Sequence, residues 1–97
     1  MTGSSRSSDG LDARRRRALF RAWRRGTREL DLLLGPFADA HIGGLGDHDL
    51  ADFEALLDAP EGDVLAWLTG REPVAPKYAT ALYQAILKFH AARHEQD

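Results

Sequence analysis

The stretch Arg24-Arg25-Gly26-Thr27-Arg28-Glu29-Leu30-Asp31 lies between two helical patterns, and it decides how the chain passes from one helix to the next. Gly26 allows a backbone turn or a close approach by another molecule. Thr27 is a suitable N-cap for the second helix, and Glu29 falls in its first turn, where the helix dipole favours negative charge. A connection that only turned a corner would not need so many charges, so we expect it also to bind a partner.

The residues before this stretch predict an amphipathic helix that begins near residue 11 or 12 and ends at Arg25. Leu19, Ala22 and Trp23 share its apolar face with Gly26. A place in the core fits Trp23 better than stacking under a guanidinium. The opposite arc carries arginines at steps of three and four residues, namely Arg14, Arg17, Arg21, Arg24 and Arg25.

Apolar residues recur with a period of about 3.6 along the rest of the chain, and no segment alternates as a strand would. The sequence therefore predicts an all-α fold, a compact five-helix bundle. In the second helix, Pro36 lacks a backbone donor, so we expect a kink or a break near Gly35.

The last three predicted helices have recognisable ends. Asp47 is the expected N-cap of the third helix. A short fourth helix is expected to start at residues 59–60 and to end at Gly70. Pro76 is expected to open the last helix, whose apolar stripe consists of Tyr78, Leu82, Ala85, Ile86 and Phe89.

The chain has 97 residues and no cysteine. We expect one domain over residues 11–94, after a Ser/Gly-rich N-terminal tail (residues 1–10) that we expect to be disordered. A domain of this size has little room for a substrate pocket of its own, so we do not expect an enzyme. No apolar run approaches the ~20 residues that span a bilayer, and no signal peptide is visible, so we expect a cytoplasmic protein without membrane insertion. We further expect it to be bacterial and monomeric.

Two histidines of the last predicted helix, His90 and His94, are spaced to bind a metal from one face. No third ligand can be assigned to them. We therefore interpret both as solvated side chains near a helix C-terminus and expect no metal site.

The net charge of −2 conceals an asymmetry between the two parts of the chain. Residues 1–34 carry nine arginines against four acids, whereas residues 35–97 carry four basic residues against eleven acids. A basic face of this kind suits a protein partner or a nucleic acid. The pI near 6.0 is low for a nucleic-acid-binding domain, so we expect no nucleic acid as partner. A small nucleic-acid- or ribosome-associated protein that uses the arginines, and a helical adaptor, remain the alternatives.

From Arg17 to Phe89 the chain resembles the SdhE family, small factors that assist covalent attachment of FAD to the flavoprotein subunit of succinate dehydrogenase. The specific part of the resemblance is Arg25-Gly26-Thr27-Arg28-Glu29-Leu30-Asp31. Further matching features follow in order: Pro36-Phe37, the acidic start of the third helix at Asp47 and Asp49, and Trp67-Leu68 before a glycine.

The resemblance implies a five-helix chaperone that binds the immature flavoprotein subunit of succinate dehydrogenase or, in some bacteria, of fumarate reductase. The flavoprotein would supply the histidine that becomes bonded to the 8α carbon of FAD, so the factor would hold no permanent cofactor and would not be the catalyst. The implied partner-binding residues are Arg25, Gly26 and Glu29, with a weaker case for Asp31. The cationic neighbours Arg24 and Arg28 complete the expected site.

Overall fold

The computed structural model describes residues 10–96, and their side chains as far as residue 93. Within this part of the chain the structure is helical and contains no strand, which confirms the predicted all-α class with five helices. The tail predicted over residues 1–10 lies, except for Gly10, outside the described residues. The helices are α1 (Ala13–Ala22), α2 (Arg28–His41), α3 (Asp47–Asp58), α4 (Glu61–Leu68) and α5 (Ala81–Gln96), with short 3₁₀ turns η1 (Ile42–Gly44) and η2 (Pro76–Tyr78).

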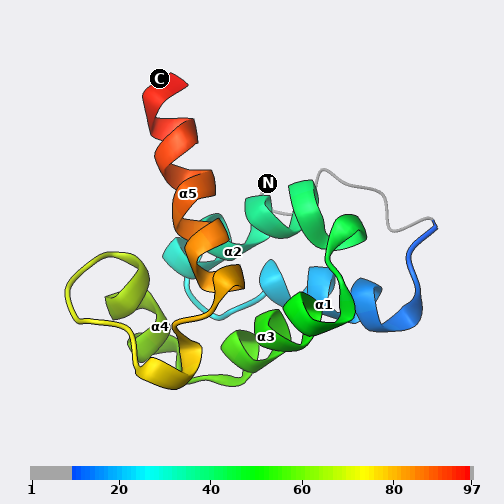
Figure 1. Ribbon diagram of the computed structural model, residues 1–97, viewed down its shortest axis with the longest axis horizontal. Coiled ribbons are helices and arrows are strands. Elements are labelled where there is room, and N and C mark those ends of the chain that lie inside the picture. Colours follow the sequence, from blue (N-terminus) through cyan, green and yellow to red (C-terminus); the bar gives the residue numbers. More distant parts are fainter. Residues whose placement is uncertain (1–9, 97) are drawn as a thin grey trace.

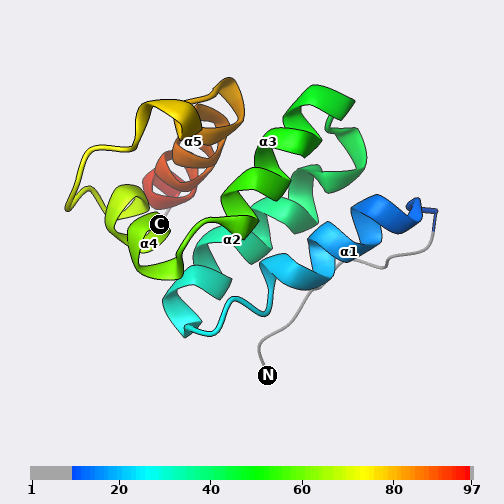
Figure 2. The ribbon, with the colours of Figure 1, turned by 90° about the horizontal axis from the view of Figure 1, so that it is seen from below.

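Helix α2 occupies the middle of the bundle (Figures 1 and 2). It contacts α1, α4 and α5, while α3 packs against α1 and α5. The C-terminal half of α5 extends beyond the rest of the molecule (Figure 1). The largest fully buried side chains come from α2 to α5 and η1, and they are Leu30, Leu34, Phe37, Ile42, Leu50, Phe53, Leu56, Leu57, Val64 and Ile86.

Helix α1 ends three residues earlier than the sequence predicts, at Ala22 rather than Arg25. The N–H of Trp23 bonds to the carbonyl of Phe20, three residues back, and this tighter turn closes the helix. Gly26 then adopts a φ of +98°, which no helical residue has. Residues 24–26 therefore form the connection to α2 and are not a continuation of α1.

Helix α2 runs unbroken through Pro36, so the break allowed for near Gly35 does not occur. Proline removes the N–H that would bond to the carbonyl of Leu32, four residues back. Leu32 lies at the surface with 45% of its area exposed, where water can replace that donor. The predicted N-cap is confirmed, because Oγ1 of Thr27 accepts a 3.3 Å hydrogen bond from the N–H of Leu30.

Two other predicted helix starts were wrong. The N-cap of α3 is Gly46, and Asp47 lies in the first turn, where its charge still suits the helix dipole. Pro76 opens only the turn η2, and α5 begins at Ala81 after Thr80, whose hydroxyl accepts from the N–H of Tyr83.

The buried face of α5 differs from the predicted apolar stripe. Tyr83 is buried together with Leu82 and Ile86, whereas Ala85 is exposed. The prediction that Gly70 ends α4 is confirmed by its φ of +79° just after the C-cap Thr69.

Trp23 joins α1 to α2 by packing against Gly35. A Cβ atom at Gly35 would overlap the indole ring, so only glycine allows this contact. The indole Nε1–H donates a 3.1 Å hydrogen bond to Oδ1 of Asp39, one turn further along α2. Trp23 thus packs at the edge of the core, half-buried, and is not stacked under a guanidinium.

Candidate docking surface at the junction of α1 and α2

The connection between α1 and α2 is held by its own polar groups. The N–H of Arg25 donates a 2.7 Å hydrogen bond to Oδ1 of Asp31, which lies in the first turn of α2. Asp31 therefore fastens the connection to the helix that follows it. Together with the Thr27 cap and the positive φ of Gly26, this bond fixes the path of the backbone.

Arg25 is buried, with only 8% of its area exposed, and this contradicts the expectation that it lies on the wet side of its helix. Its Nη2 donates a 3.3 Å hydrogen bond to the carbonyl of Ala59, between α3 and α4. Its Nε is also buried and has no hydrogen-bond partner among the described residues. Burial lowers the pKa of the Arg25 guanidinium, and the nearby charge of Glu61 opposes that effect. Arg25 thus connects the α1–α2 junction to the corner between α3 and α4.

Gly26 is exposed, and the first turn of α4 lies beside it. A Cβ atom built on Gly26 would come 2.9 Å from Oε2 of Glu61. Glu61 therefore belongs to the same surface, although it is 35 positions away in the sequence. Sequence reasoning missed it, because nothing in the local pattern of α4 indicates which residue faces Gly26.

The remaining predicted residues of the junction point outward. Arg24, Arg28 and Glu29 are exposed, and Arg28 and Glu29 make no hydrogen bond or ion pair with any described residue. Leu32, one turn beyond them on α2, is exposed as well and was not among the predicted site residues. We call Arg24, Gly26, Arg28, Glu29, Leu32 and Glu61 the junction surface. It offers charges of both signs, one apolar side chain and an open piece of backbone.

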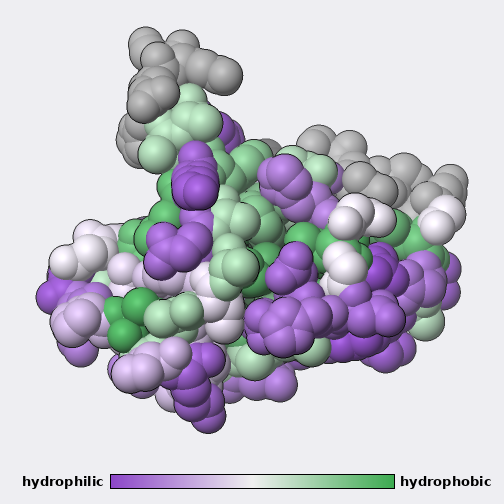
Figure 3. All heavy atoms as spheres, viewed as in Figure 1, coloured by the Kyte–Doolittle hydropathy of each residue, from purple (hydrophilic) through white to green (hydrophobic). Residues whose placement is uncertain are grey.

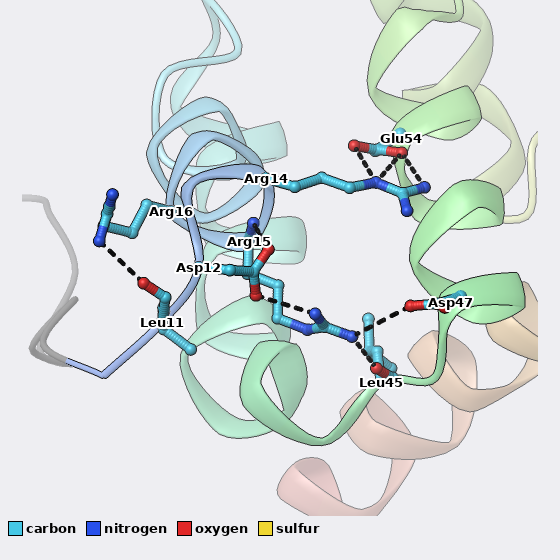
Figure 4. A network of polar contacts seen from close by, with 8 residues as sticks. All are labelled: Leu11, Asp12, Arg14, Arg15, Arg16, Leu45, Asp47 and Glu54. Atoms are coloured by element: carbon cyan, nitrogen blue, oxygen red, sulfur yellow. Dashed lines mark hydrogen bonds and ion pairs between the residues drawn. The ribbon is translucent and has the colours of Figure 1, made fainter.

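Some arginines of α1 point toward α3 and others point away from it (Figure 4). Arg14 points toward α3 and binds the carboxylate of Glu54, through Nη2 at 2.6 Å and Nε at 3.0 Å. Further along, Nη2 of Arg21 lies 2.6 Å from Oδ1 of Asp58 at the end of α3. The hydrogen bonds from Arg14 hold the pKa of the Glu54 carboxyl below its usual range. Arg14 and Arg21 therefore attach α1 to α3.

Arg15 and Arg16 follow Arg14 in α1, and their side chains point in different directions (Figure 4). Arg15 bonds to the N-cap Asp12 at 2.8 Å and to the carbonyl of Leu45 at 2.6 Å. Arg16 turns away from α3 and bonds only to the carbonyl of Leu11, at 2.8 Å. Hydrophilic side chains accordingly cover the part of the molecule where Figure 1 places α1 and the start of α3 (Figure 3).

His90 does not belong to a metal site among the described residues. Nε2 of His90 lies 2.6 Å from the carbonyl of Leu33, and the side chain is half-buried, so the interpretation of His90 as a solvated residue was wrong. The side chain of His94 lies outside the described residues. Over the part of the chain that the structure covers, no group of three or more potential ligands is placed to hold a metal ion. Nor does any described helix have the length and apolar character to cross a membrane.

Comparison with known proteins gives a family for the chain. The model of a family described as the flavinator of succinate dehydrogenase matches residues 16–90. That range includes the whole junction surface and all helices except the first turn of α1 and the end of α5. No solved structure gives a significant match.

Similar curated proteins include one from a bacterium and others from fungi and flies. The FAD assembly factor SdhE of Acetobacter pasteurianus is 37% identical over 87 residues, which cover 90% of this chain and 80% of that protein. The mitochondrial succinate dehydrogenase assembly factor 2 of Debaryomyces hansenii is 34% identical over 95 residues, 95% of this chain and 67% of that protein. The factor of the same name from Mycosarcoma maydis is 36% identical over 74 residues, but the match spans only 31% of its length.

Proposed function

Because the chain belongs to the family of flavinators of succinate dehydrogenase, we propose that it binds the flavoprotein subunit of that enzyme and promotes covalent attachment of FAD. The client supplies the residue to which the flavin becomes bonded. This chain therefore acts as a chaperone and not as a catalyst. We propose that it does so as a monomer in the bacterial cytoplasm.

The observation that carries this proposal is the exposure of unpaired charges on a rigid junction. Arg28 and Glu29 reach solvent from the first turn of α2 without any partner among the described residues. Exposed charges without an internal role do not stabilise the fold appreciably, whereas they direct the orientation and rate of protein association. Leu32 beside them adds an apolar contact of the kind found at the centre of interfaces.

We assign Arg25 and Asp31 a supporting role behind this surface. The bond from the Arg25 N–H to Asp31 and the bond from its guanidinium to Ala59 fix the backbone on both sides of Gly26. A surface held in one conformation loses less entropy when a partner binds it. The two residues would thus affect docking by positioning Gly26, Arg28 and Glu29.

The chemical effect of docking is a shift in population. A client subunit that fluctuates between arrangements reaches the one competent for flavin attachment more often if the factor binds that arrangement more tightly. A preference of about 3 kcal/mol would raise a 1% population to a majority. No group of this chain needs to enter the reaction itself.

Addition of the purified protein to the client tests this function. The flavoprotein subunit, produced in a strain that lacks this protein, is incubated with FAD, with and without the wild-type chain. Covalent flavin is then read as fluorescence of the denatured subunit on a gel. We expect the wild-type chain to increase that fluorescence several-fold, and equal fluorescence with and without it would refute the function.

A further inference from the structure

The outward side of α1 carries an exposed aromatic ring among arginines. Phe20 is 58% exposed, the highest value among the exposed large hydrophobic residues that the structure describes. Arg16 and Arg17 lie four and three positions before it in the helix, which places them on the same side of α1, and the guanidinium of Arg24 stands over the ring. We call Arg16, Arg17, Phe20 and Arg24 the outer face of α1.

The guanidinium groups of this face form no ion pair with a carboxylate of the described residues. The side chain of Arg17 makes no hydrogen bond there, although its charge helps to lower the pKa of Glu54, and the side chain of Arg16 bonds only to the carbonyl of Leu11. Two carboxylates of α3, those of Glu54 and Asp58, are bound by Arg14 and Arg21 on the side of α1 that faces α3. The outer face thus keeps its positive charge for a group from outside.

The ring of Phe20 contacts a guanidinium group. The guanidinium carbon of Arg24 stands 3.8 Å from the ring centroid, a cation–π contact, and Nη1 of Arg24 also reaches the carbonyl of Phe20 at 3.5 Å. Beside the ring is an open hollow of about 480 Å³, lined among the described residues by Ala13, Arg16, Arg17, Phe20 and Arg21. An aromatic side chain beside a hollow and surrounded by guanidinium groups has the composition of an interface centre.

We propose that the outer face of α1 binds an acidic segment of the client flavoprotein, with an apolar side chain of that segment against Phe20. This proposal rests on the proposed function and extends the contact beyond the junction surface. Arg24 belongs to both surfaces, so one client can cover them together. Charge complementarity selects an acidic segment, since none of the three guanidinium groups on this face forms an ion pair with a carboxylate of the described residues.

Two other occupants fit the outer face less well. Residues 1–9 carry one arginine and one acid, and Met1 is their only large apolar residue, so they offer neither the charge nor the anchor. A nucleic acid would stack on several aromatic rings, whereas this face has one, and residues 35–97 carry a net −7 that repels a polyanion.

Binding of purified full-length variants to the client subunit without covalent flavin tests the proposal. Phe20→Gln removes the ring at a position that the core does not use, and Arg17→Gln removes one unpaired charge. Leu87→Gln and Arg71→Gln are the matched controls, since Leu87 is exposed on α5 and Arg71 is exposed in the connection after α4. Circular dichroism verifies that all four variants are folded.

We expect Phe20→Gln to weaken binding about tenfold and Arg17→Gln to weaken it a few-fold with a smaller dependence on salt, while both controls bind like the wild type. Wild-type binding that Phe20→Gln leaves unchanged would overturn this proposal and leave the proposed function intact. Absence of wild-type binding would instead refute the proposed function. Binding of random duplex DNA at about 0.15 M salt that Phe20→Gln abolishes would assign the face to nucleic acid.

Discussion

The guanidinium of Arg25 donates a hydrogen bond to the main-chain carbonyl of Ala59, and this bond joins the α1–α2 junction to the corner between α3 and α4. The residue is 8% exposed and its Nε has no hydrogen-bond partner among the described residues. Burial of a charge with a single hydrogen bond costs free energy that must be recovered from packing. Arg25 is therefore part of the interior of the fold, although it belongs to the motif that carries the family resemblance.

The first prediction concerns the packing of Arg25. Arg25→Ala should lower the free energy of unfolding by about 1–3 kcal/mol, because it leaves a gap in the interior. Arg25→Met fills a similar volume without a buried charge and should be about as stable as the wild type. Urea unfolding monitored by circular dichroism gives both values. An Arg25→Ala variant as stable as the wild type would show that the side chain is not packed as described.

Glu29 should behave in the opposite way. It is exposed and has no partner among the described residues, so Glu29→Ala should change the free energy of unfolding by about 0.5 kcal/mol or less. The same variant should reduce covalent flavin in the client, because the charge is lost from the junction surface. Glu72→Ala, at another exposed position, is the control and should leave flavin attachment unchanged. Loss of stability in Glu29→Ala with normal flavin attachment would contradict both parts.

Gly26 and Gly70 provide a matched pair of backbone positions. Both have a positive φ, +98° and +79°, and both are exposed, but only Gly26 lies in the junction surface. Asparagine tolerates this region better than other side chains, so each substitution to Asn should cost on the order of 1 kcal/mol of stability. The contact with Glu61 adds little, because the end of a flexible side chain can move aside.

We expect Gly26→Asn to fold but to support little flavin attachment, and Gly70→Asn to support normal attachment. Thermal melts compare the two stabilities, and fluorescence of the denatured client subunit compares the two activities. If both variants were equally active, Gly26 would be required only for the backbone turn. The contact surface would then have to be sought on α1.

Acid should weaken the attachment of α1 to α3. The pKa of Glu54 is lowered in the folded protein by its hydrogen bonds with Arg14, relative to an ordinary value of 4.5. A lowered pKa means that the carboxylate stabilises the fold fully above about pH 4.5, and that this contribution is lost as the pH falls through the folded value. Glu54→Gln should therefore lose less stability than the wild type between about pH 5 and pH 3. Urea unfolding at several pH values measures the difference, and parallel curves would contradict it.

Nucleic acid should bind only weakly. Ion pairs with α3 occupy Arg14 and Arg21, so fewer free cations remain than the arginine count of the sequence indicates. Binding of random duplex DNA should be measurable at low salt and should fall steeply as salt is added. Fluorescence anisotropy of a labelled duplex provides the measurement. Tight binding near physiological salt would favour the alternative of a nucleic-acid-binding protein.

The local parts of the fold could be predicted from the sequence. The helical class, the Thr27 cap and the glycine at the end of α4 depend on a few neighbouring residues, and each was confirmed. Pro36 shows the limit of local rules such as the helix-breaking effect of proline. The free energy that proline costs a helix depends on whether solvent reaches the carbonyl that loses its hydrogen-bond donor. The placement of Leu32 at the surface decides that question, and it comes from the packing of α2 among its neighbours.

The candidate site could be predicted only in part, because contacts with residues far away in the sequence decide which of its side chains are exposed and which are buried. Arg24 and Arg25 are adjacent and chemically identical, yet one is exposed and the other is buried. The difference arises from the Ala59 carbonyl, 34 positions away. The acids that bind the arginines of α1 likewise come from α3, so a reading of α1 alone overestimates its free charge.

Because Trp23 packs against Gly35 next to the connection between α1 and α2, its intrinsic fluorescence can report on that connection. The chain has two tryptophans, and Trp67 stands near Tyr78, remote in sequence from the connection between α1 and α2. In a Trp67→Phe variant, the tryptophan fluorescence would come from Trp23 alone, which lies three residues before the turn at Gly26. Its indole is half-buried and hydrogen-bonded to Asp39. Binding of a client to the junction surface would change the emission wavelength or the quenching of Trp23, so the association could be followed in real time without an attached dye.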